Sequence, residues 1–497
     1  MDNSVASSPH QNLHFVLVPW LAQGHIIPMI DIARLLAHRG ITVSLVTTPA
    51  NLTRIKPTAD RIHESKLPIR FLPLPFPSTE FGLPAGCENI DSLPSKSLVL
   101  NFYNACKALK QPLMDYLRDP KTPSPNCIIS DFGHPWAADI AREFSVPRFV
   151  FHGFNCFAIL CIENLTIYKT HESVPSDTEP LVLPGLPQRI EISRISRLQL
   201  PRQFQVSQPY EEIQKEVRES EMGADGIVIN SFDELEVGYK GLLEKSSGKK
   251  SWMIGPVSFI NNGSKDLAER GNRTLIEETK CKNWLDSMTP DSVVYVCFGS
   301  MGSFGPSQLI ELGSGLLASN KPFIWVIKSI QNPEVEDWLS ENFSDDSKCL
   351  IIRGWAPQAM ILSHAAVGGF LTHCGWNSAL EGICAGLPLL TWPMFAEQFL
   401  NEKLVLEVLK IGVSIGVKTP TEWAGEVKDD VVVSREEIAK AVETVMDEAE
   451  EAGGRRRRAK ELAEMAKRAM EEGGSSYVNL TGLIQYALDC QSVKNVM

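Results

Sequence analysis

The segment between residues 355 and 398 carries a dense set of side chains that could bind a ligand. His373 ends an apolar run that is typical of a buried strand, and residues 375–378 open a helix. Free backbone N–H groups and the positive end of the helix dipole meet at such a junction, which therefore favours an anion. Asn377 and Ser378 add side-chain donors at the same point. The pattern predicts a phosphate-binding helix N-terminus.

Two further side chains extend this site toward a nucleotide. Glu381, one helical turn further on, could accept hydrogen bonds from a diol such as a ribose, and Trp355 offers a flat ring on which any base can stack. Two other interpretations stay open from the residues alone: an ordinary buried strand and helix with a hydrogen-bonded histidine, or a zinc site. The zinc site would use His364, His373 and Cys374. The neighbouring residues His373 and Cys374 would have to bind one ion with an unusual geometry, and a fourth ligand at familiar spacing is missing.

Two titratable side chains follow expected strands in the first half of the chain. His25 follows an expected strand at 13–18, and Asp131 follows one at 127–130. A neutral imidazole near pH 7 can accept a proton from a hydroxyl group, and a neighbouring carboxylate can stabilise the imidazolium that results. From spacing alone, a lone histidine such as His25 is more often a structural cap or a core residue, and Asp131 could equally be a helix N-cap.

Alternating strands and helices must position these side chains. In the first half, the strand at 13–18 leads to a helix that Pro28 opens and Gly40 stops, and the next strand follows at 41–46. This is a βαβ unit with two parallel strands. The same rhythm predicts further strands at 127–130, 148–152 and 226–230. The first half is therefore expected to form a doubly wound α/β sheet.

A second sheet of the same kind is predicted in the second half. Its strands are expected at 293–298, 323–327, 350–352, 367–372 and 389–391. A helix should run from Pro306 to about Asn320, and Ser434 and Glu437 predict a capping box for a late helix. Two such domains that face each other leave a cleft at the carboxyl ends of both sheets.

The chain is expected to divide at residues 256–281, a polar segment rich in glycine and asparagine that is typical of a linker or an exposed loop. This gives a first domain at 1–255 and a second at 282–474. A Gly-Gly break then separates a final segment at 475–497. That segment carries an apolar stripe at helical spacing, formed by Leu480, Leu483, Ile484 and Leu488.

The composition excludes several classes of function. Of the 497 residues, 43% are hydrophobic and 22% charged, as in globular proteins, and the formal charge of -12 disfavours nucleic acid as a partner. Eleven cysteines without a CxxC pair indicate reduced thiols and a cytoplasmic protein. We expect neither a signal peptide nor a membrane-spanning segment. The basic cluster at 455–458 is interpreted as a solvated helix face, with an anion site as the alternative.

Residues 355–398 form a 44-residue segment that resembles, without a gap, the signature of the plant secondary-product glycosyltransferases. The resemblance covers nearly the whole chain, with matching positions at Gly24-His25, Phe298-Gly299-Ser300 and 472–476. It implies a plant family 1 enzyme that uses a uridine-diphosphate (UDP) sugar, in the branch that modifies flavonoids, triterpenoids and hormones. It also implies the GT-B fold: two facing Rossmann-like domains, the first for the acceptor and the second for the UDP-sugar, with a C-terminal helix that crosses back to pack on the first domain.

The resemblance implies a role for each matching residue. Trp355 would stack on the uracil, Gln358 would hold the uracil and ribose region, and Glu381 would bind the ribose hydroxyls. Glu397 and Gln398 would bind the sugar, and Gln398 points to glucose. The full implied donor set is Ser300, Trp355, Ala356, Gln358, His373, Trp376, Asn377, Ser378, Glu381, Glu397 and Gln398.

The implied reaction is the inverting transfer of glucose from UDP-glucose to a hydroxyl of a small apolar plant metabolite. His25 would be the general base, supported by Asp131. UDP-glucose would be a co-substrate, with no cofactor and no metal, because the helix N-terminus can meet the leaving diphosphate and the chain has no Asp-x-Asp motif. Another UDP-sugar, a C-glycoside product and a non-catalytic binding protein are the alternatives. A nicotinamide-dependent oxidoreductase is disfavoured because G-x-G-x-x-G is missing after the first strand.

The acceptor site is expected to be apolar and suited to a flat or bulky molecule. The candidate residues for it are Trp20, Phe81, Phe204 and Phe395. Trp20 stands where related proteins often carry Phe and would narrow the pocket. His134 would be either a second polar contact or a surface histidine. We expect a monomer whose partners are the UDP-sugar and a small acceptor, with no nucleic acid and no membrane span.

Overall fold

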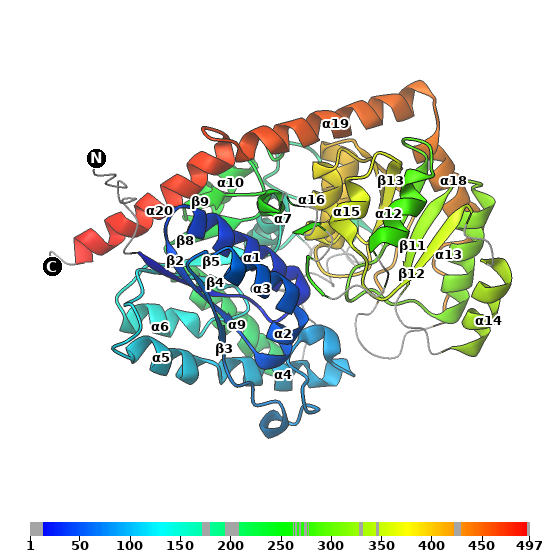
Figure 1. The fold of residues 1–497 in the computed structure, drawn as a ribbon. Helices are drawn as coiled ribbons and strands as arrows, with labels where there is room; N and C mark the ends of the chain where they lie inside the picture. Colours follow the sequence, from blue (N-terminus) through cyan, green and yellow to red (C-terminus); the bar gives the residue numbers. More distant parts are fainter. Residues whose placement is uncertain are drawn as a thin grey trace, which may run out of the picture.

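The computed structural model describes residues 13–170, 179–193, 208–261, 263, 266–267, 270–272, 276, 278–327, 332–343, 347–421 and 429–494. These residues form two lobes that lie side by side, each built around a parallel β-sheet with helices packed on it (Figure 1). The predicted pair of doubly wound α/β domains is confirmed.

Seven parallel strands form the sheet of the first lobe, in the order β3-β2-β1-β4-β5-β8-β9. Their bounds are β1 His14–Val18, β2 Thr42–Thr47, β3 Ile69–Pro73, β4 Cys127–Asp131, β5 Arg148–His152, β8 Gly226–Ile229 and β9 Ser251–Met253. Every residue of β1, β4 and β5 is buried, as expected when helices cover both faces of a parallel sheet. Val18 pairs with Ser130, so the residues that follow β1 and end β4 meet at one edge of the sheet.

Six parallel strands form the sheet of the second lobe, in the order β12-β11-β10-β13-β14-β15. Their bounds are β10 Val293–Cys297, β11 Phe323–Ile327, β12 Cys349–Arg353, β13 Val367–Thr372, β14 Leu389–Thr391 and β15 Gly412–Ser414. Cys297 pairs with Thr372, so the loops that follow β10 and β13 also meet at one edge. A separate antiparallel pair consists of β6 Pro180–Val182 and β7 Glu191–Ser193.

Helices connect the strands in both lobes. Those of the first lobe are α1 Gln23–His38, α2 Pro49–Arg54, α3 Lys56–Glu64, α4 Val99–Lys107, α5 Lys110–Arg118, α6 Ala137–Glu143, α7 Cys156–Tyr168, α9 Gln208–Met222 and α10 Tyr239–Ser247. Those that follow are α12 Glu278–Asp286, α13 Pro306–Ala318, α14 Pro333–Asn342, α15 Gln358–Leu362, α16 Trp376–Cys384, α17 Gln398–Lys403, α18 Arg435–Met446, α19 Glu450–Met470 and α20 Ser475–Lys494. The capping box predicted for α18 is confirmed, because Ser434 and Glu437 each accept a hydrogen bond from the other's backbone N–H.

The C-terminal part of the chain joins the two lobes. α19 packs on α16 of the second lobe, and α20 packs on β9 of the first. Figure 1 shows these helices, in orange and red, along one side of both lobes. Leu480 and Leu483 of α20 enter the apolar core that contains Trp252. The predicted crossing of the C-terminal helix to the first domain is therefore confirmed.

Three strands at sheet edges have no clear signal in the sequence: β3, β9 and β15. β9 and β15 are three residues long, too short to show an alternation of apolar and polar residues. β3 is only partly buried and contains the exposed Arg70. Pairing with a neighbouring strand, rather than a local pattern, selects these segments.

The basic cluster 455–458 differs from the solvated helix face that was expected. Arg455 is buried and donates to the carbonyl oxygen of Thr444 (3.4 Å), and Arg456 donates to that of Val445 (3.2 Å). Both acceptors lie in the last turn of α18, where carbonyl groups lack helical partners and the dipole favours a cation. Arg455 and Arg456 therefore connect α19 to the end of α18, whereas Arg457 is exposed as expected and Arg458 donates to the Lys410 carbonyl oxygen (2.7 Å).

The limits of the two domains stay a prediction. The last strand of the first sheet ends at Met253 and the first strand of the second begins at Val293, so the expected linker 256–281 lies between the sheets. This linker is not a loop throughout, because it contains a short 3₁₀ helix at Val257–Ile260 and the start of α12.

All eleven cysteines are free thiols. Within the described part of the chain, no helix is both long and apolar enough to cross a membrane.

Candidate active site

A cavity of about 660 Å³ lies between the two lobes, at the carboxyl ends of both sheets. Its lining contains the whole predicted donor set and the proposed base: His25, Ser300, Trp355, Ala356, Gln358, His373, Trp376, Asn377, Ser378, Glu381, Glu397 and Gln398. Residues from distant parts of the sequence thus share one space because both sheets end at it.

His25 and Asp131 form a direct contact on the first-lobe side. His25 lies in the first turn of α1, Asp131 is the last residue of β4, and His25 Nδ1 lies 2.5 Å from Asp131 Oδ2. Asp131 is fully buried, whereas 17% of the His25 side chain is exposed. Because Nδ1 is engaged, Nε2 is the ring nitrogen that can exchange a proton with a ligand.

Asp131 is not a helix N-cap, which was the alternative. The N-cap of the next helix, α6, is Trp136, and the Oδ1 atom of Asp131 accepts from the backbone N–H of Gly133 (3.1 Å) instead. Burial alone would lower the pKa of His25, but the carboxylates of Asp131 and, more weakly, Glu397 together raise that pKa above its ordinary value.

The N-terminus of α16 forms the opposite wall of the cavity. Gly375 is its N-cap, and a Cβ atom at that position would come within 2.3 Å of His373 Nε2, so only glycine lets the imidazole lie against the helix start. The Trp376 side chain contacts the first lobe: its Nε1 donates to the Asn230 carbonyl oxygen (2.7 Å). The helix start is thus held close to both lobes.

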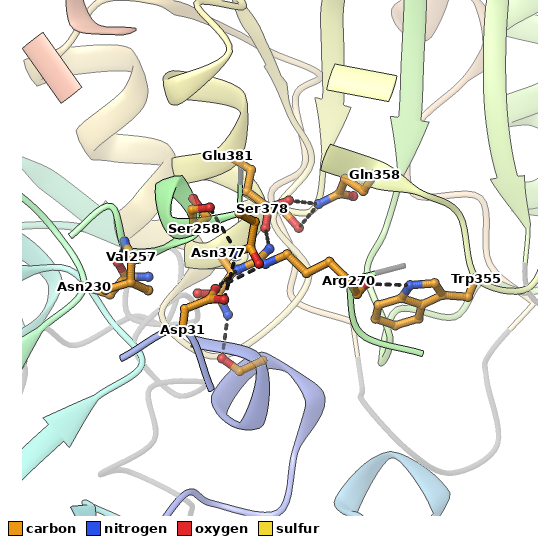
Figure 2. Close-up of polar contacts among 12 residues, drawn as sticks. Asp31, Asn230, Val257, Ser258, Arg270, Trp355, Gln358, Asn377, Ser378 and Glu381 are labelled. Atoms are coloured by element: carbon orange, nitrogen blue, oxygen red, sulfur yellow. Dashed lines mark hydrogen bonds and ion pairs between the residues drawn. The ribbon is translucent and has the colours of Figure 1, made fainter. Parts of the chain in front are cut away.

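The residues that were predicted to bind the nucleoside contact one another. Gln358 Nε2 donates to Glu381 Oε2 (2.9 Å) and lies 3.3 Å from Ser378 Oγ, as Figure 2 shows. Glu381 also accepts from Arg270, and Trp355 Nε1 donates to the Arg270 carbonyl oxygen (3.3 Å). Arg270 was not predicted, because it lies in a polar segment that was interpreted as an exposed linker.

The two predicted sugar-binding residues are buried at the start of α17. Gln398 Oε1 accepts from the backbone N–H groups of Met394 (2.9 Å) and Phe395 (3.1 Å), which leaves its Nε2 as the group that can donate to a ligand. Burial raises the pKa of Glu397 to about 7, and Asn401 Nδ2 donates to its Oε1 (3.3 Å). The carboxyl can therefore exchange a proton near neutral pH.

The predicted acceptor residues fall in different places. Trp20 and Phe395 line the cavity. Phe81 packs instead on a core cluster of the first lobe. Phe204 lies outside the described residues.

His134 is neither exposed nor part of the cavity lining. It is fully buried, its Nε2 lies 2.9 Å from the Pro19 carbonyl oxygen, and its ring contacts Trp20 at a centroid distance of 5.2 Å. Burial lowers its pKa to about 4, so it is neutral at physiological pH. Both alternatives for His134 are therefore wrong: it is a buried residue that packs against Trp20.

Among the residues that the structure describes, no group of three His, Cys, Asp or Glu side chains is placed to hold a metal ion. His364 Nε2 lies 3.0 Å from Asp286 Oδ1, and the buried Cys374 Sγ lies 3.6 Å from the Thr372 carbonyl oxygen. These contacts contradict the zinc alternative.

Two family models match the chain. The one described as "Glycosyltransferase, N-terminal domain" matches residues 11–259, and the one described as "UDP-glucoronosyl and UDP-glucosyl transferase" matches residues 276–450. UDP-glycosyltransferase 73D1 of Arabidopsis thaliana is 47% identical over 98% of this chain and 99% of its own. UDP-glycosyltransferase 73E1 of Stevia rebaudiana is 48% identical over 96% of this chain and 97% of its own.

Solved structures agree with this similarity. Glycyrrhiza uralensis UGT73P12, complexed with glycyrrhetinic acid 3-O-monoglucuronide, is 38% identical with a TM-score of 0.88, over 97% of each chain. Medicago truncatula UGT71G1, complexed with UDP-glucose, is 25% identical with a TM-score of 0.76, over 97% of this chain and 99% of its own. The chain therefore belongs to the UDP-glycosyltransferases of plant family 1, in the UGT73 subfamily, with the GT-B fold.

Proposed function

We propose that this enzyme transfers glucose from UDP-glucose to a hydroxyl group of a small apolar plant metabolite, with inversion at the anomeric carbon. His25 is the general base, and Asp131 orients it and stabilises its charged form. One observation carries the proposal: the 2.5 Å contact between His25 Nδ1 and Asp131 Oδ2 lies across a single cavity from the N-terminus of α16.

In the proposed step, the acceptor hydroxyl gives its proton to His25 Nε2 while its oxygen forms a bond to C1 of glucose. The bond between C1 and the diphosphate oxygen breaks on the opposite face, and UDP leaves with the electron pair. A single displacement of this kind converts an α-linked donor into a β-linked product. The imidazolium that forms beside Asp131 is stabilised by the carboxylate.

The leaving diphosphate gains negative charge as the bond breaks. Backbone N–H groups at the start of α16, together with side chains of His373, Asn377 and Ser378, are suited to stabilise that charge. These groups are fixed before the reaction begins, so little reorganisation is needed. Glu381 and Gln358 bind the ribose, and Trp355 stacks on the uracil.

Glucose is proposed as the sugar because Gln398 offers an amide donor beside the carboxyl of Glu397. Related structures were solved with different donors: Medicago truncatula UGT71G1 with UDP-glucose and Arabidopsis thaliana UGT89C1 with UDP-L-rhamnose. The shared fold therefore accepts different sugars, and the sugar of this enzyme needs a direct test.

The acceptor is proposed to be a flat or bulky apolar molecule, such as a triterpenoid or a flavonoid. Trp20, Phe132, Phe154 and Phe395 are among the aromatic residues that line the cavity, and the ring of Phe132 lies 6.1 Å from that of His25 between centroids. Relatives of this fold were solved with glycyrrhetinic acid 3-O-monoglucuronide and with quercetin. Aromatic walls with one polar group are suited to such ligands.

We also propose that the enzyme acts as a monomer in the cytosol. Eleven free cysteines, most of them buried, fit a reducing compartment. The reacting groups of the proposed site all come from one chain.

The experiment is a product screen with UDP-glucose and a flavonol, a triterpenoid and a cytokinin as acceptors. Mass spectrometry detects the product, and proton NMR gives the anomeric configuration. We expect a β-linked O-glucoside that acid hydrolysis can release. An α-linked product would contradict the single displacement, and a product that resists acid would indicate a C-glycoside instead. UDP-galactose and UDP-glucuronic acid in parallel reactions test the sugar.

A further inference from the structure

A buried arginine from the segment between the sheets joins a carboxylate of each lobe. Arg270 Nη2 and Nε donate to Asp31 Oδ2 of α1 (2.7 and 3.2 Å), and its Nη1 donates to Glu381 Oε1 of α16 (Figure 2). Only 11% of the Arg270 side chain is exposed. A guanidinium suits this position because its planar fork can serve two carboxylates at once.

The contact with Glu381 leaves room for a ribose. One oxygen of Glu381 accepts from Arg270 and the other from Gln358 Nε2 (2.9 Å). A carboxylate can accept about four hydrogen bonds, so positions remain for the two ribose hydroxyls. Arg270 and Gln358 thus hold the carboxylate in one orientation without filling its acceptor capacity.

The main chain of the same segment holds Trp355. The Arg270 carbonyl oxygen accepts from Trp355 Nε1 (3.3 Å). The next residue, Gly271, lies so close to the indole that a Cβ atom there would come within 2.6 Å of Trp355 Cζ2. The edge of the ring is therefore fixed by residues outside the signature segment.

Asp31 anchors Arg270 to the first lobe. It is almost fully buried in α1, and its Oδ1 accepts from Asn261 Nδ2 (2.8 Å). The chain Asp31–Arg270–Glu381 therefore runs from the core of the first lobe to the middle of α16, the second-lobe helix whose N-terminus faces the cavity.

We propose that Arg270 is a positioning residue for the nucleotide of the donor. It acts through Glu381, whose carboxylate it orients toward the ribose, and through Trp355, whose indole its main chain holds in place. By its contact with Asp31 it also connects the nucleotide site to the lobe that carries His25. This inference rests on the donor roles proposed above for Glu381 and Trp355.

The first test measures UDP binding to Arg270→Ala by calorimetry. We expect the Kd for UDP to rise roughly 10-fold or more, because an oriented charged hydrogen bond is lost. Arg61→Ala is the matched control: its side chain is 20% exposed and pairs with Asp266 of the same segment (3.0 Å), so it tests how far anchoring of the segment affects UDP binding. The control should leave the Kd for UDP close to that of the parent enzyme.

A second test asks whether Arg270 acts through Glu381. In a double-mutant cycle with Glu381→Gln, the effect of Arg270→Ala on UDP binding should shrink, since both changes remove the same oriented carboxylate. The effect should also shrink for 2′,3′-dideoxy-UDP, which lacks the ribose hydroxyls. In kinetics, the KM for UDP-glucose should rise more than kcat falls.

Arg270→Ala leaves two buried carboxylates without a charged partner and could unfold the protein. The variant Asp31→Asn/Arg270→Met removes one charge of each sign and should show the same weakening of UDP binding. Tighter UDP binding in either variant, or an effect equal to that of Arg61→Ala, would overturn the inference. If Glu381→Gln alone leaves UDP binding unchanged, the proposed donor role of Glu381 fails instead, whatever Arg270 does.

Discussion

His25 can accept the proton of the acceptor hydroxyl only while its imidazole is neutral. The protonation state of this side chain therefore determines the pH range of the proposed reaction. Burial alone would lower its pKa, but Asp131 and, more weakly, Glu397 raise it above the ordinary value. The neutral fraction of His25 therefore grows as pH rises through this raised pKa, and the rate should rise with it.

Asp131→Asn should change the pH profile in a defined direction. Without the carboxylate, the folded-state pKa of His25 falls, so the acid limb of kcat/KM should move to lower pH while the plateau drops by about 10² to 10⁴. The measurement is kcat/KM against pH for both proteins. An acid limb that stays in place would show that Asp131 does not set the pKa of the base.

Gln398→His should change the sugar that the enzyme prefers. Gln398 uses its oxygen to hold the Met394–Phe395 backbone and leaves only its amide N–H groups for a ligand, a division that an imidazole cannot reproduce. We expect the ratio of kcat/KM for UDP-glucose to that for UDP-galactose to fall. Gln308→His is the control, because Gln308 Oε1 also accepts from two successive backbone N–H groups, at Val432 (2.6 Å) and Val433 (3.0 Å), but outside the cavity. An altered ratio in both variants, or in neither, would place sugar discrimination elsewhere.

Single residues differ in how far the sequence reveals them. His25, Asp131 and the donor set could be placed at one cavity because each follows a strand or opens a helix, and parallel strands end at a common edge. Their roles stay predictions. The roles of Arg270 and Asp31 could not be predicted. A single charged residue in a polar segment or on a helix has no local pattern, and the contacts Asp31–Arg270 and Arg270–Glu381 exist only in the folded chain.

Among the elements, α20 shows how a pattern predicts a contact but not its partner. The stripe that includes Leu480 and Leu483 indicates a buried helix face, and only the resemblance suggested that the face packs on the first lobe. The structure places both residues in the core beside Trp252 and Phe149. α20 therefore shares an apolar core with the first sheet, and this core fixes the C-terminal helix to the first lobe.

Leu483→Ala should destabilise the first lobe by about 2–5 kcal/mol, because it leaves a cavity in a fully buried position. Urea unfolding measures the loss. Val478→Ala on the same helix is the control: Val478 is 55% exposed, and its truncation should change the free energy of unfolding by less than about 0.5 kcal/mol. UDP affinity should be unchanged in both variants. Equal stability of the two variants would contradict the packing of α20 on the first sheet.

Local patterns predict elements well when the element is long and central. The core strands β1, β4, β5, β10 and β13 are near-continuous apolar runs, as fully covered parallel strands require. The edge strands β3, β9 and β15 are short or half-exposed, so pairing rather than composition determines them. Likewise, charge alone could not show that Arg455 and Arg456 of α19 bind the end of α18.

At the scale of the whole molecule, the site exists only because the lobes meet in one arrangement. Trp376 Nε1 donates to the Asn230 carbonyl (2.7 Å), and Asn155 Nδ2 donates to Asn401 Oδ1 (2.6 Å), each across the two lobes. Each half of the site could be predicted from its own sheet. The distance between the halves could not, since it depends on contacts between residues hundreds of positions apart.

The central claim is that His25 takes the acceptor proton while the second lobe holds the nucleotide. The most direct measurement is the rate of glucoside formation by His25→Ala at a UDP-glucose concentration that saturates it, with UDP affinity measured on the same sample. We predict that glucosylation of hydroxyl acceptors falls by at least about 10²-fold while the Kd for UDP stays near that of the parent enzyme. A variant that retains the parent rate, or one that loses activity and UDP affinity in equal measure, would contradict the account.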